Sequence, residues 1–456
     1  MLDLSPKYES ACKYIFESAR RLGGSAYFVG GCVRDALLGA KSKDFDIEVY
    51  GLEPQVLENM LRENFRVEMV GKSFGVWILK GYDIDVSIPR RERKVGEGHK
   101  AFDIESDPYM PIDQACARRD FTLNAILYDY LSDKIIDPYN GVADLKNGVL
   151  RHTSERFAED PLRVLRAMQF SARFDMEVAP ETIELCSQIP FENLPVERVC
   201  EEWKKLLLKG MKISRGLNFL RDCGWIKYFP ELNATVGCQQ DPEWHPEGDV
   251  FTHTGFCLDA FASARTGDAR EDFVVGLAVL CHDLGKPRCT KIGDDGKVHS
   301  YGHDILGVEP TRKFLSRLTR EKSIVEEVVP LVERHMAILD LWRVQAGDSA
   351  IRRLARKVGR IDRLVRVDFA DRNGRGDGYY QDDSPQGQWI TERATELAVK
   401  DSAPEPIVMG RHLQELGMKP SPEFGKILSH LYEEQLDGVF SDLDGGLNRL
   451  HKMLEM

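Results

Sequence analysis

The chain has 456 residues, of which 42% are hydrophobic and 30% charged, and its formal net charge is −12. This length is enough for several domains with separate cores, and no apolar run reaches transmembrane length, which excludes a membrane-spanning helical protein. The N-terminal segment mixes acidic and basic side chains without an apolar stretch, and the ten cysteines form no Cys-x-x-Cys pair. We therefore expect a cytoplasmic protein with reduced thiols and no membrane partner.

A Gly-Gly turn and a pair of acids stand out near the N-terminus. A strand-like segment ends at Gly30 and Gly31, and a second strand-like segment carries Asp44 and Asp46. Alternate residues of a strand share a face, so the two carboxylates lie side by side. They repel each other unless a cation lies between them, and oxygen ligands suit Mg²⁺. Beside a turn that admits phosphate, this pattern predicts nucleotidyl transfer; a solvated edge strand is the alternative.

The order of these motifs resembles the head domain of bacterial tRNA nucleotidyltransferases and poly(A) polymerases. The family pattern is Gly-Gly-x-Val-Arg-Asp, a short linker and Asp-x-Asp, and residues 30–35 and 44–46 match it. The resemblance implies an α+β fold with a nucleotidyltransferase head built on a small mixed β-sheet and helices, similar to the polymerase β palm. An all-α neck, an HD-type helical body and a helical C-terminal arm are expected to follow.

A third carboxylate is expected on a neighbouring strand. Residues 74–90 predict two strands joined at Lys80 and Gly81, with Asp83 and Asp85 on one face of the second strand. Alignment to the family pattern favours Asp85 over Asp83. The resemblance implies that the acids are catalytic and that the glycine turn and a nearby arginine hold the triphosphate. Asp44 and Asp46 would bind Mg²⁺, Asp85 would activate the primer 3'-hydroxyl, and Gly30, Gly31 and Arg34 would bind the nucleotide.

Two later segments resemble the nucleotide-binding motifs of the family. Residues 118–125 are similar to Arg-Arg-Asp-Phe-Thr-x-Asn-Ala, which meets the ribose and triphosphate. Residues 159–163 resemble Glu-Asp-x-x-Arg, whose Asp and Arg pair with bases that carry an amino group and exclude U and G. A simple helix cap at Asp160 is the alternative, and it is compatible with base pairing. The nucleotide-binding residues implied by the two motifs are Arg119, Asp120, Asn124, Asp160 and Arg163.

The segment Glu197–Glu202 resembles the family's Glu-Arg-x-x-x-Glu. The resemblance implies structural support for the base-reading helix from three residues. An ion pair on a helix surface is the alternative. The supporting residues would be Glu197, Arg198 and Glu202.

Two features relate to RNA binding. The polar segment between Asp85 and Arg118, with glycines at 96 and 98, predicts a mobile loop. In the family a full-length loop accompanies complete C-C-A addition. Four arginines at helical spacing predict either a basic face for RNA phosphates or a solvated charged face; they are Arg352, Arg356, Arg360 and Arg363.

A second chemical centre follows the head. Histidines and aspartates recur in the order H…HD…H…H…D, which resembles the HD-domain metal phosphohydrolases. Such ligands from separate helices hold one or two transition-metal ions, and Ni²⁺, Co²⁺ or Mn²⁺ is expected. In related tRNA nucleotidyltransferases this domain is linked to phosphatase, 2'-nucleotidase and 2',3'-cyclic phosphodiesterase activity; a tRNA-binding body without turnover is the alternative. The predicted ligands are His253, His282, Asp283, His303, His335 and Asp371.

The motifs predict four domains: a head (1–148), a neck that reads the base (149–245), an HD domain (246–376), and a linker with a helical arm (377–456), for which a packing arm and a tRNA contact are the alternatives. The predicted function is addition or repair of the 3'-terminal CCA of tRNA, at its acceptor end, from CTP and ATP with release of pyrophosphate. The alternatives are an A-adding, CC-adding or poly(A) polymerase relative, and an HD-centred phosphohydrolase with an RNA-binding head. The sequence predicts no oligomeric state.

Overall fold

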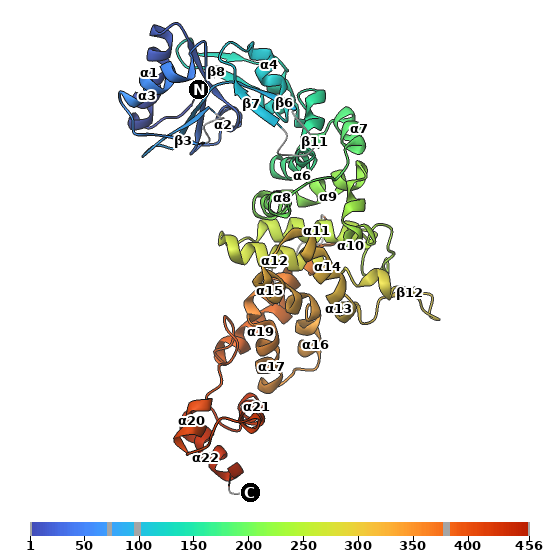
Figure 1. Cartoon of the computed structure of the whole chain (residues 1–456). Helices are drawn as coiled ribbons and strands as arrows, with labels where there is room; N and C mark the ends of the chain where they lie inside the picture. Colours follow the sequence, from blue (N-terminus) through green and yellow to red (C-terminus); the bar gives the residue numbers. More distant parts are fainter. Residues whose placement is uncertain (1, 71–74, 95–101, 377–383, 455–456) are drawn as a thin grey trace. The chain divides into compact units, whose positions relative to one another are not determined.

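The structure, a computed structural model, describes residues 2–70, 75–94, 102–376 and 384–454 (Figure 1). The central part of the predicted loop, with Gly96 and Gly98, lies outside the described residues. So does the segment 377–383 of the predicted linker.

The chain divides into two compact units. The first comprises Met1–Glu202 and Asn218–Trp225, and the second comprises Trp203–Leu217 and Ile226–Met456. The division falls inside the predicted neck. The finer separation into four domains therefore stays a prediction.

A seven-stranded sheet forms the centre of the first unit, in the order β3-β4-β5-β2-β1-β8-β9. Neighbouring strands are antiparallel except for β2 and β5, which run parallel. The mixed sheet expected for the head is thereby confirmed. Its strands are β1 (Ser25–Val29), β2 (Phe45–Tyr50), β3 (Val67–Val70), β4 (Val76–Leu79), β5 (Ile84–Ser87), β8 (Leu127–Asp129) and β9 (Lys134–Ile136).

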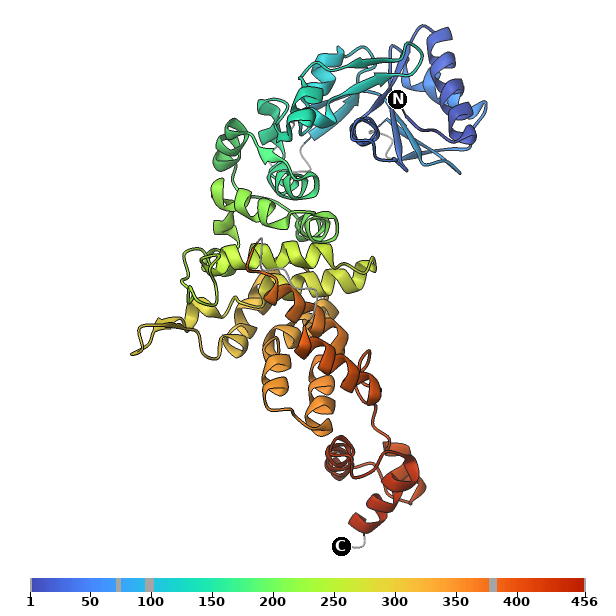
Figure 2. The same cartoon turned by 180° about the vertical axis from the view of Figure 1, so that it is seen from behind.

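Two helices, α1 (Pro6–Arg21) and α3 (Pro54–Arg62), pack against one face of this sheet, and the blue helices beside it can be followed in Figures 1 and 2. Strand alternation explains the packing, because Ile47 of β2 is fully buried in the core that α1 and α3 close. Its neighbour Asp46, which pairs in register with Val29, points to the opposite face because successive residues of a strand alternate. The core thus fixes which side of the sheet carries the acids.

The polar segment that predicted a mobile loop contains two strands. β6 (Arg90–Lys94) and β7 (Phe102–Ser106) pair antiparallel, from Arg90 opposite Ser106 to Lys94 opposite Phe102. Its polar composition resembles that of a loop, and the backbone ladder that joins the two strands carries no side-chain pattern. The prediction of a loop throughout this segment was wrong.

The rest of the first unit is made of short helices and small strand pairs. They are α2 (Gly31–Leu37), α4 (Ile112–Ala117), the 3₁₀ turns η1 (Thr122–Asn124) and η2 (Glu155–Glu159), α5 (Gly141–Asn147), β10 (Val149–Leu150), α6 (Leu162–Phe174), β11 (Glu177–Val178) and α7 (Pro180–Gln188). Two further helices, α8 (Val196–Lys209) and α9 (Ile213–Asp222), cross the division between the units.

The second unit is helical apart from one small strand pair, as predicted for the body and arm. Helix α11 packs beside α12 and α18, although more than ninety residues separate α11 from α18, and Figures 1 and 2 show these yellow-green and orange segments side by side. Its elements are η3 (Trp225–Tyr228), α10 (Pro230–Asn233), α11 (Val250–Ser263), α12 (Ala269–Cys281), η4 (Lys286–Arg288), β12 (Lys291–Ile292), β13 (Val298–His299), α13 (His303–Leu306), α14 (Val308–Leu318), α15 (Lys322–Glu333), α16 (Ala337–Arg343), α17 (Asp348–Val358), α18 (Ile361–Arg372), α19 (Pro385–Glu396), α20 (Gly410–Glu415), α21 (Pro422–Leu436) and α22 (Leu443–Leu454).

The arginines that predicted a basic or solvated face are paired with acids of the second unit. Arg356 contacts Glu433 of α21. Arg363 is buried and donates to Glu271 and Glu327, at 2.7 Å each. Arg356 stays exposed on α17, as the solvated reading expects, whereas Arg363 is buried on α18, so the run does not form one continuous face. Contact of these arginines with RNA stays a prediction.

All ten cysteines are free thiols. Among the described residues, no helix combines the length and the apolar composition that crossing a bilayer requires.

The sheet core can be tested with Ile47→Ala. The side chain is fully buried between the sheet and helices α1 and α3, so its truncation should cost the first unit about 2–5 kcal/mol of unfolding free energy. Because the chain has two units, hydrogen exchange of peptides from β1 and β2 is the suitable measurement. Ile135→Ala, at a position 43% exposed, serves as control and should change the same peptides little; equal effects of the two variants would contradict this packing.

Candidate active sites

Three carboxylates lie on the face of the head sheet opposite α1 and α3. Asp46 and Asp85 are register partners on the parallel strands β2 and β5, both keep contact with solvent, and Asp44 directly precedes β2. Burial by the surrounding protein raises the pKa of Asp46; Arg119 opposes this, and Asp85 and Asp44 raise it further. Burial and Asp44 also raise the pKa of Asp85. Such mutually repelling carboxylates suit a divalent cation with a preference for oxygen ligands.

The second acid of the 74–90 segment has a different environment. Asp83 precedes β5 and accepts a hydrogen bond of 2.9 Å from the hydroxyl of Tyr8. Asp85, in contrast, stands directly beside Asp46. The register therefore supports Asp85 as the third member of the acidic cluster.

The glycine turn lies against this cluster. Gly30 has φ +71°, a backbone conformation that side chains disfavour. A Cβ at this position would lie 3.1 Å from Nη1 of Arg119 and 3.7 Å from Oδ2 of Asp46. Helix α2 then begins at Gly31. The turn thus favours glycine for its conformation and because a Cβ would crowd the guanidinium of Arg119.

The 118–125 segment is joined to α2 and α6 by a buried polar network. Arg34 donates from Nη1 to Oδ1 of Asn124 at 2.8 Å, and Asn124 donates to Oδ1 of Asp120 at 2.9 Å. Arg166 of α6 donates to Oδ2 of Asp120 at 2.7 Å. Burial would raise the pKa of Asp120, but Arg166 and Asn124 outweigh it and hold that pKa below its usual value. Arg34, Asp120 and Asn124 are therefore fixed in position as one unit.

Arg119 lies between this network and the acidic cluster. Its Nη2 is 3.5 Å from Oε1 of Glu48, and its Nη1 donates to the carbonyl of Asn124 at 3.3 Å. A pocket of about 270 Å³ opens here, lined by Glu48, Arg90, Arg118 and Arg119 among others. The three guanidinium groups that line this pocket offer the positive charge that a triphosphate requires, and Arg119 also lies near Asp46.

The residues expected to read the base lie at the start of α6. Oδ1 of Asp160 accepts the backbone N–H of Leu162 at 3.1 Å, so the helix-cap reading also applies. Oδ2 of Asp160 pairs with Arg198 at 2.8 Å, which ties α8 to this end of α6. Arg163 donates to the carbonyl oxygens of Arg156 and Arg118, at 2.8 and 2.6 Å. Both side chains are partly exposed and keep hydrogen-bonding capacity for a ligand.

The two glutamates expected to support this helix differ from each other. Glu202 is buried and its charge acts on Arg166. Glu197 is exposed on the surface of α8. The position of Glu202 therefore suits the supporting role better than that of Glu197.

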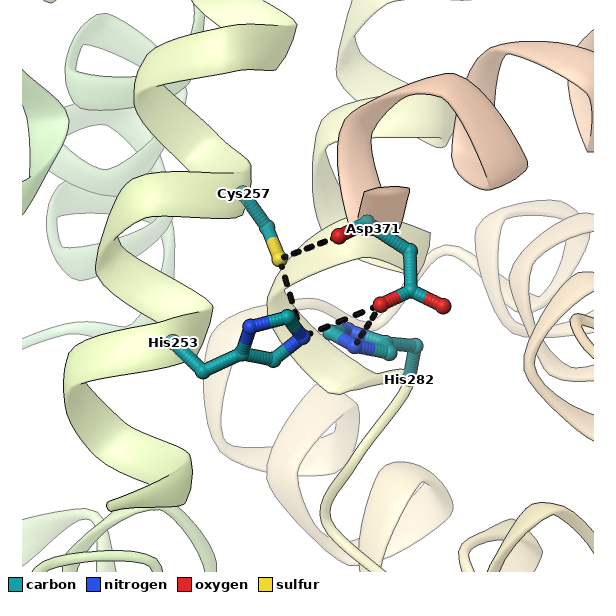
Figure 3. Close-up of side chains that lie close together, drawn as sticks. All are labelled: His253, Cys257, His282 and Asp371. Atoms are coloured by element: carbon teal, nitrogen blue, oxygen red, sulfur yellow. Dashed lines mark hydrogen bonds and ion pairs between the residues drawn. The ribbon is translucent and has the colours of Figure 1, made fainter. Parts of the chain in front are cut away.

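The six predicted metal ligands gather in the second unit. Oδ1 of Asp371, on α18, lies 3.0 Å from Nε2 of His253 and 3.6 Å from Nε2 of His282, and Figure 3 shows these side chains pointing toward one another. Asp283, beside His282 in sequence, belongs to an adjoining group. Nε2 of His303 lies 3.4 Å from Oδ1 of Asp283 and 3.0 Å from Nε2 of His335 in that group. The predicted ligands therefore form two adjacent clusters.

The histidines present the same nitrogen to the centre. Nδ1 of His282 lies 2.7 Å from the carbonyl of Val279, Nδ1 of His303 lies 2.8 Å from that of Ser300, and Nδ1 of His335 lies 2.7 Å from that of Val332. A carbonyl accepts a hydrogen bond from Nδ1–H, which keeps the proton on Nδ1 and leaves the lone pair of Nε2 for a metal. Burial, with the nearby His282 and His303, also lowers the pKa of His335 to about 4, so its imidazole is neutral, the form that binds metal.

Buried atoms at this centre fit a metal. Within the described part of the chain, Nε2 of His282 and both carboxylate oxygens of Asp283 are buried and have no hydrogen-bond partner. Their contacts are ion-pair distances to Asp283, of 3.2 Å from Nε2 of His282, 3.4 Å from Nε2 of His303 and 2.7 Å from Nζ of Lys286. Buried polar atoms without partners are costly unless a ligand satisfies them. The N and O donor set suits a transition metal.

A pocket of about 630 Å³ opens onto the second cluster. Its wall includes Asp283, His303 and His335, together with Lys286 and Arg372. The rings of His299 and Tyr301, which also line it, are stacked with their centroids 5.0 Å apart. The pocket therefore offers cationic groups for a phosphate and aromatic surface for a base.

The structure adds three residues that the motif order did not predict. Nδ1 of His253 lies 2.7 Å from Oε1 of Glu247, which also lies 2.9 Å from Nδ1 of His245. The thiol of Cys257 lies 3.3 Å from Nε2 of His253. The spacing of four residues from His253 to Cys257 was visible in the sequence as one helical turn. Nothing in the sequence distinguished this thiol from an apolar core residue.

Comparison with known proteins places this architecture in a family. Residues 26–151 match the poly A polymerase head domain. A multifunctional CCA protein of Xylella fastidiosa is 36% identical over 394 residues, which is 82% of this chain and 90% of that protein. A multifunctional CCA protein of Neisseria meningitidis is 40% identical over 306 residues, 66% of this chain and 70% of that protein.

Solved structures share the fold over nearly the whole chain. The Bacillus stearothermophilus CCA-adding enzyme in complex with CTP has a TM-score of 0.66 at 23% identity and covers 99% of this chain and 100% of its own. The Thermotoga maritima CCA-adding enzyme complexed with tRNA has a TM-score of 0.60 at 20% identity and covers 99% and 96%. The fold class predicted from the motifs is confirmed. The chain therefore belongs to the family of the multifunctional CCA proteins.

Proposed function

We propose that this protein adds or repairs the 3'-terminal CCA of tRNA, using CTP and ATP with Mg²⁺ and releasing pyrophosphate. One observation carries the proposal: Asp46 and Asp85 stand in register on parallel strands, beside the Gly30 turn and Arg119. The relatives named for CCA addition and the structures with CTP and with tRNA support the substrates. A cytoplasmic location, where tRNA and nucleotides are available, is part of the proposal.

The residues of the head then have distinct roles. Asp44 and Asp46 would hold Mg²⁺, which neutralises charge on the triphosphate and activates the attacking hydroxyl when bound. Asp85 faces the primer 3'-hydroxyl, which attacks the α-phosphate in line as the bond to pyrophosphate breaks. Backbone groups of Gly30 and Gly31 hold the phosphates together with the guanidinium of Arg119. The ribose lies against the Asp120–Asn124 pair, which Arg34 keeps in place.

Base choice is assigned to the start of α6. Asp160 accepts from the exocyclic amino group of C or A, and Arg163 donates to a ring acceptor. Arg198 fixes the Asp160 carboxylate through an ion pair of 2.8 Å. The same pair of protein groups thus replaces a nucleic-acid template.

A second activity is assigned to the HD centre. The group formed by Asp283, His303 and His335 opens onto the 630 Å³ pocket. With Ni²⁺, Co²⁺ or Mn²⁺ held by these ligands and by the neighbouring His253, His282 and Asp371, a bound ion would supply an activated water for phosphoester hydrolysis. Lys286 and Arg372 would orient the phosphate. This hydrolysis is independent of the chemistry of the head.

The acidic cluster is tested by Asp46→Asn, which removes a charge from the proposed Mg²⁺ site. Nucleotide incorporation into tRNA should fall more than about 100-fold, because even groups that only support a metal ligand contribute 10–100-fold. Asp83→Asn is the matched control: it alters a carboxylate two residues from Asp85 that bonds Tyr8 instead. Equal losses in both variants would show that the register does not identify the working acids.

Base selection is tested by Asp160→Ala, with each of the four nucleotides supplied singly. Discrimination against U and G should weaken by about 1–3 kcal/mol, more than the incorporation of C slows. Arg198→Met should shift selectivity in the same direction and less, since it leaves Asp160 present but unfixed. Glu159→Ala changes an exposed neighbouring acid and should keep full selectivity. Unchanged selectivity in Asp160→Ala would refute the pairing role.

The independence of the two centres is tested by His282→Ala. Hydrolysis of a 2',3'-cyclic nucleotide in the presence of Ni²⁺, Co²⁺ or Mn²⁺ should disappear, whereas CCA addition should remain. Asp46→Asn should give the opposite pattern. His430→Ala, on the exposed side of α21, should affect neither activity. Joint loss of both activities in either active-site variant would contradict separate centres.

A further inference from the structure

One thiol lies inside the first HD metal cluster. Sγ of Cys257 belongs to a set with His253, His282 and Asp371 in which one ligand atom of each residue lies within 4.8 Å of the other three. Figure 3 shows the sulfur on the side of His253 that faces Asp371. The cluster therefore offers one sulfur, two nitrogens and one oxygen.

Three distances between the donor atoms are close to those of a four-coordinate site. Sγ lies 3.3 Å from Nε2 of His253, which lies 3.0 Å from Oδ1 of Asp371, and that oxygen lies 3.6 Å from Nε2 of His282. A tetrahedral ion with bonds of about 2.0–2.3 Å to such atoms separates them by about 3.3–3.8 Å. The separations of 3.3 and 3.6 Å fall within this range, and that of 3.0 Å between His253 and Asp371 falls just below it.

Neighbouring groups hold the sulfur in this place. Cys257 is fully buried one helical turn after His253 on α11. The chain after α18 passes close to it at Gly374, where a Cβ would overlap Sγ of Cys257. Independently of the thiol, Nε2 of His282 is buried and has no hydrogen-bond partner among the described residues; it lies 3.2 and 3.6 Å from the carboxylates of Asp283 and Asp371. A donor atom left without a partner points to a ligand at this position.

We propose that Cys257 is a metal ligand, which completes a Cys-His-His-Asp site for Zn²⁺ or Co²⁺ in the HD domain. A thiolate selects these ions over Mn²⁺ and Mg²⁺. Binding releases the thiol proton to solvent. Four protein ligands close this site, so the adjoining group of Asp283, His303 and His335 keeps the open position for water. The inference rests on the proposed function only in that the HD centre holds a metal.

The test is titration of metal-free full-length protein with Co²⁺, followed by absorption in the near ultraviolet. Sulfur ligation gives a sulfur-to-cobalt charge-transfer band that nitrogen and oxygen ligands do not give. The band should appear with the native protein, vanish in Cys257→Ser and persist in Cys289→Ser, whose thiol lies outside the cluster. Competition with a chelator should show Zn²⁺ affinity reduced more than about tenfold in Cys257→Ser alone.

X-ray absorption of the zinc-loaded native protein keeps the proposal testable should a variant fail to fold; one sulfur at about 2.3 Å is expected. Bound cobalt or zinc without sulfur ligation would overturn the role of Cys257 and leave the HD centre intact. Failure to bind either ion would overturn both. Cyclic-nucleotide hydrolysis, measured separately, decides whether the proposed second activity stands.

Discussion

The repulsion between Asp46 and Asp85 is the constraint on which the head depends. The apolar residues between the acids hold β2 and β5 against α1 and α3, and this packing forces the carboxylates together on the opposite face. The protein by itself does not neutralise this negative charge, because Arg119 offsets only part of the effects that raise the pKa of Asp46. The packing of the core therefore holds these repelling carboxylates together. Their charge is neutralised only when a cation, with the phosphates bound to it, occupies the site.

The HD centre also brings potential metal ligands close together, but these are mainly histidine nitrogens and aspartate oxygens. Carbonyl groups fix the tautomer of three histidines, and Glu247 engages the Nδ1 of His253, so every imidazole presents Nε2 inward. As proposed, the head would bind its cation through exposed carboxylate oxygens, whereas the HD centre would bind through largely buried nitrogen, oxygen and sulfur atoms. This difference in donor chemistry would separate the metals of the two sites.

The sequence predicted features that depend on local periodicity and missed those that depend on distant partners. Strand alternation predicted that Asp46 lies on the sheet face near the glycine turn, where the structure has it, and helical patterns predicted the segments that carry His253 and His282. The Asp160–Arg198 pair joins residues 38 positions apart, and Cys257 meets Asp371 114 positions later. The neutralisation of Arg363 by Glu271 likewise arises only in the folded chain. Such contacts carry no signal in a single sequence.

The central claim is tested most directly by extension of a tRNA transcript that lacks its last three nucleotides, with Mg²⁺ and products resolved at single-nucleotide length. Complete CCA addition predicts two additions with CTP alone and three with CTP and ATP together. A stop after two nucleotides with both substrates, A addition only to tRNA that already ends in C-C, or long A tails would contradict complete CCA synthesis. No extension would leave the HD centre as the working site of this protein.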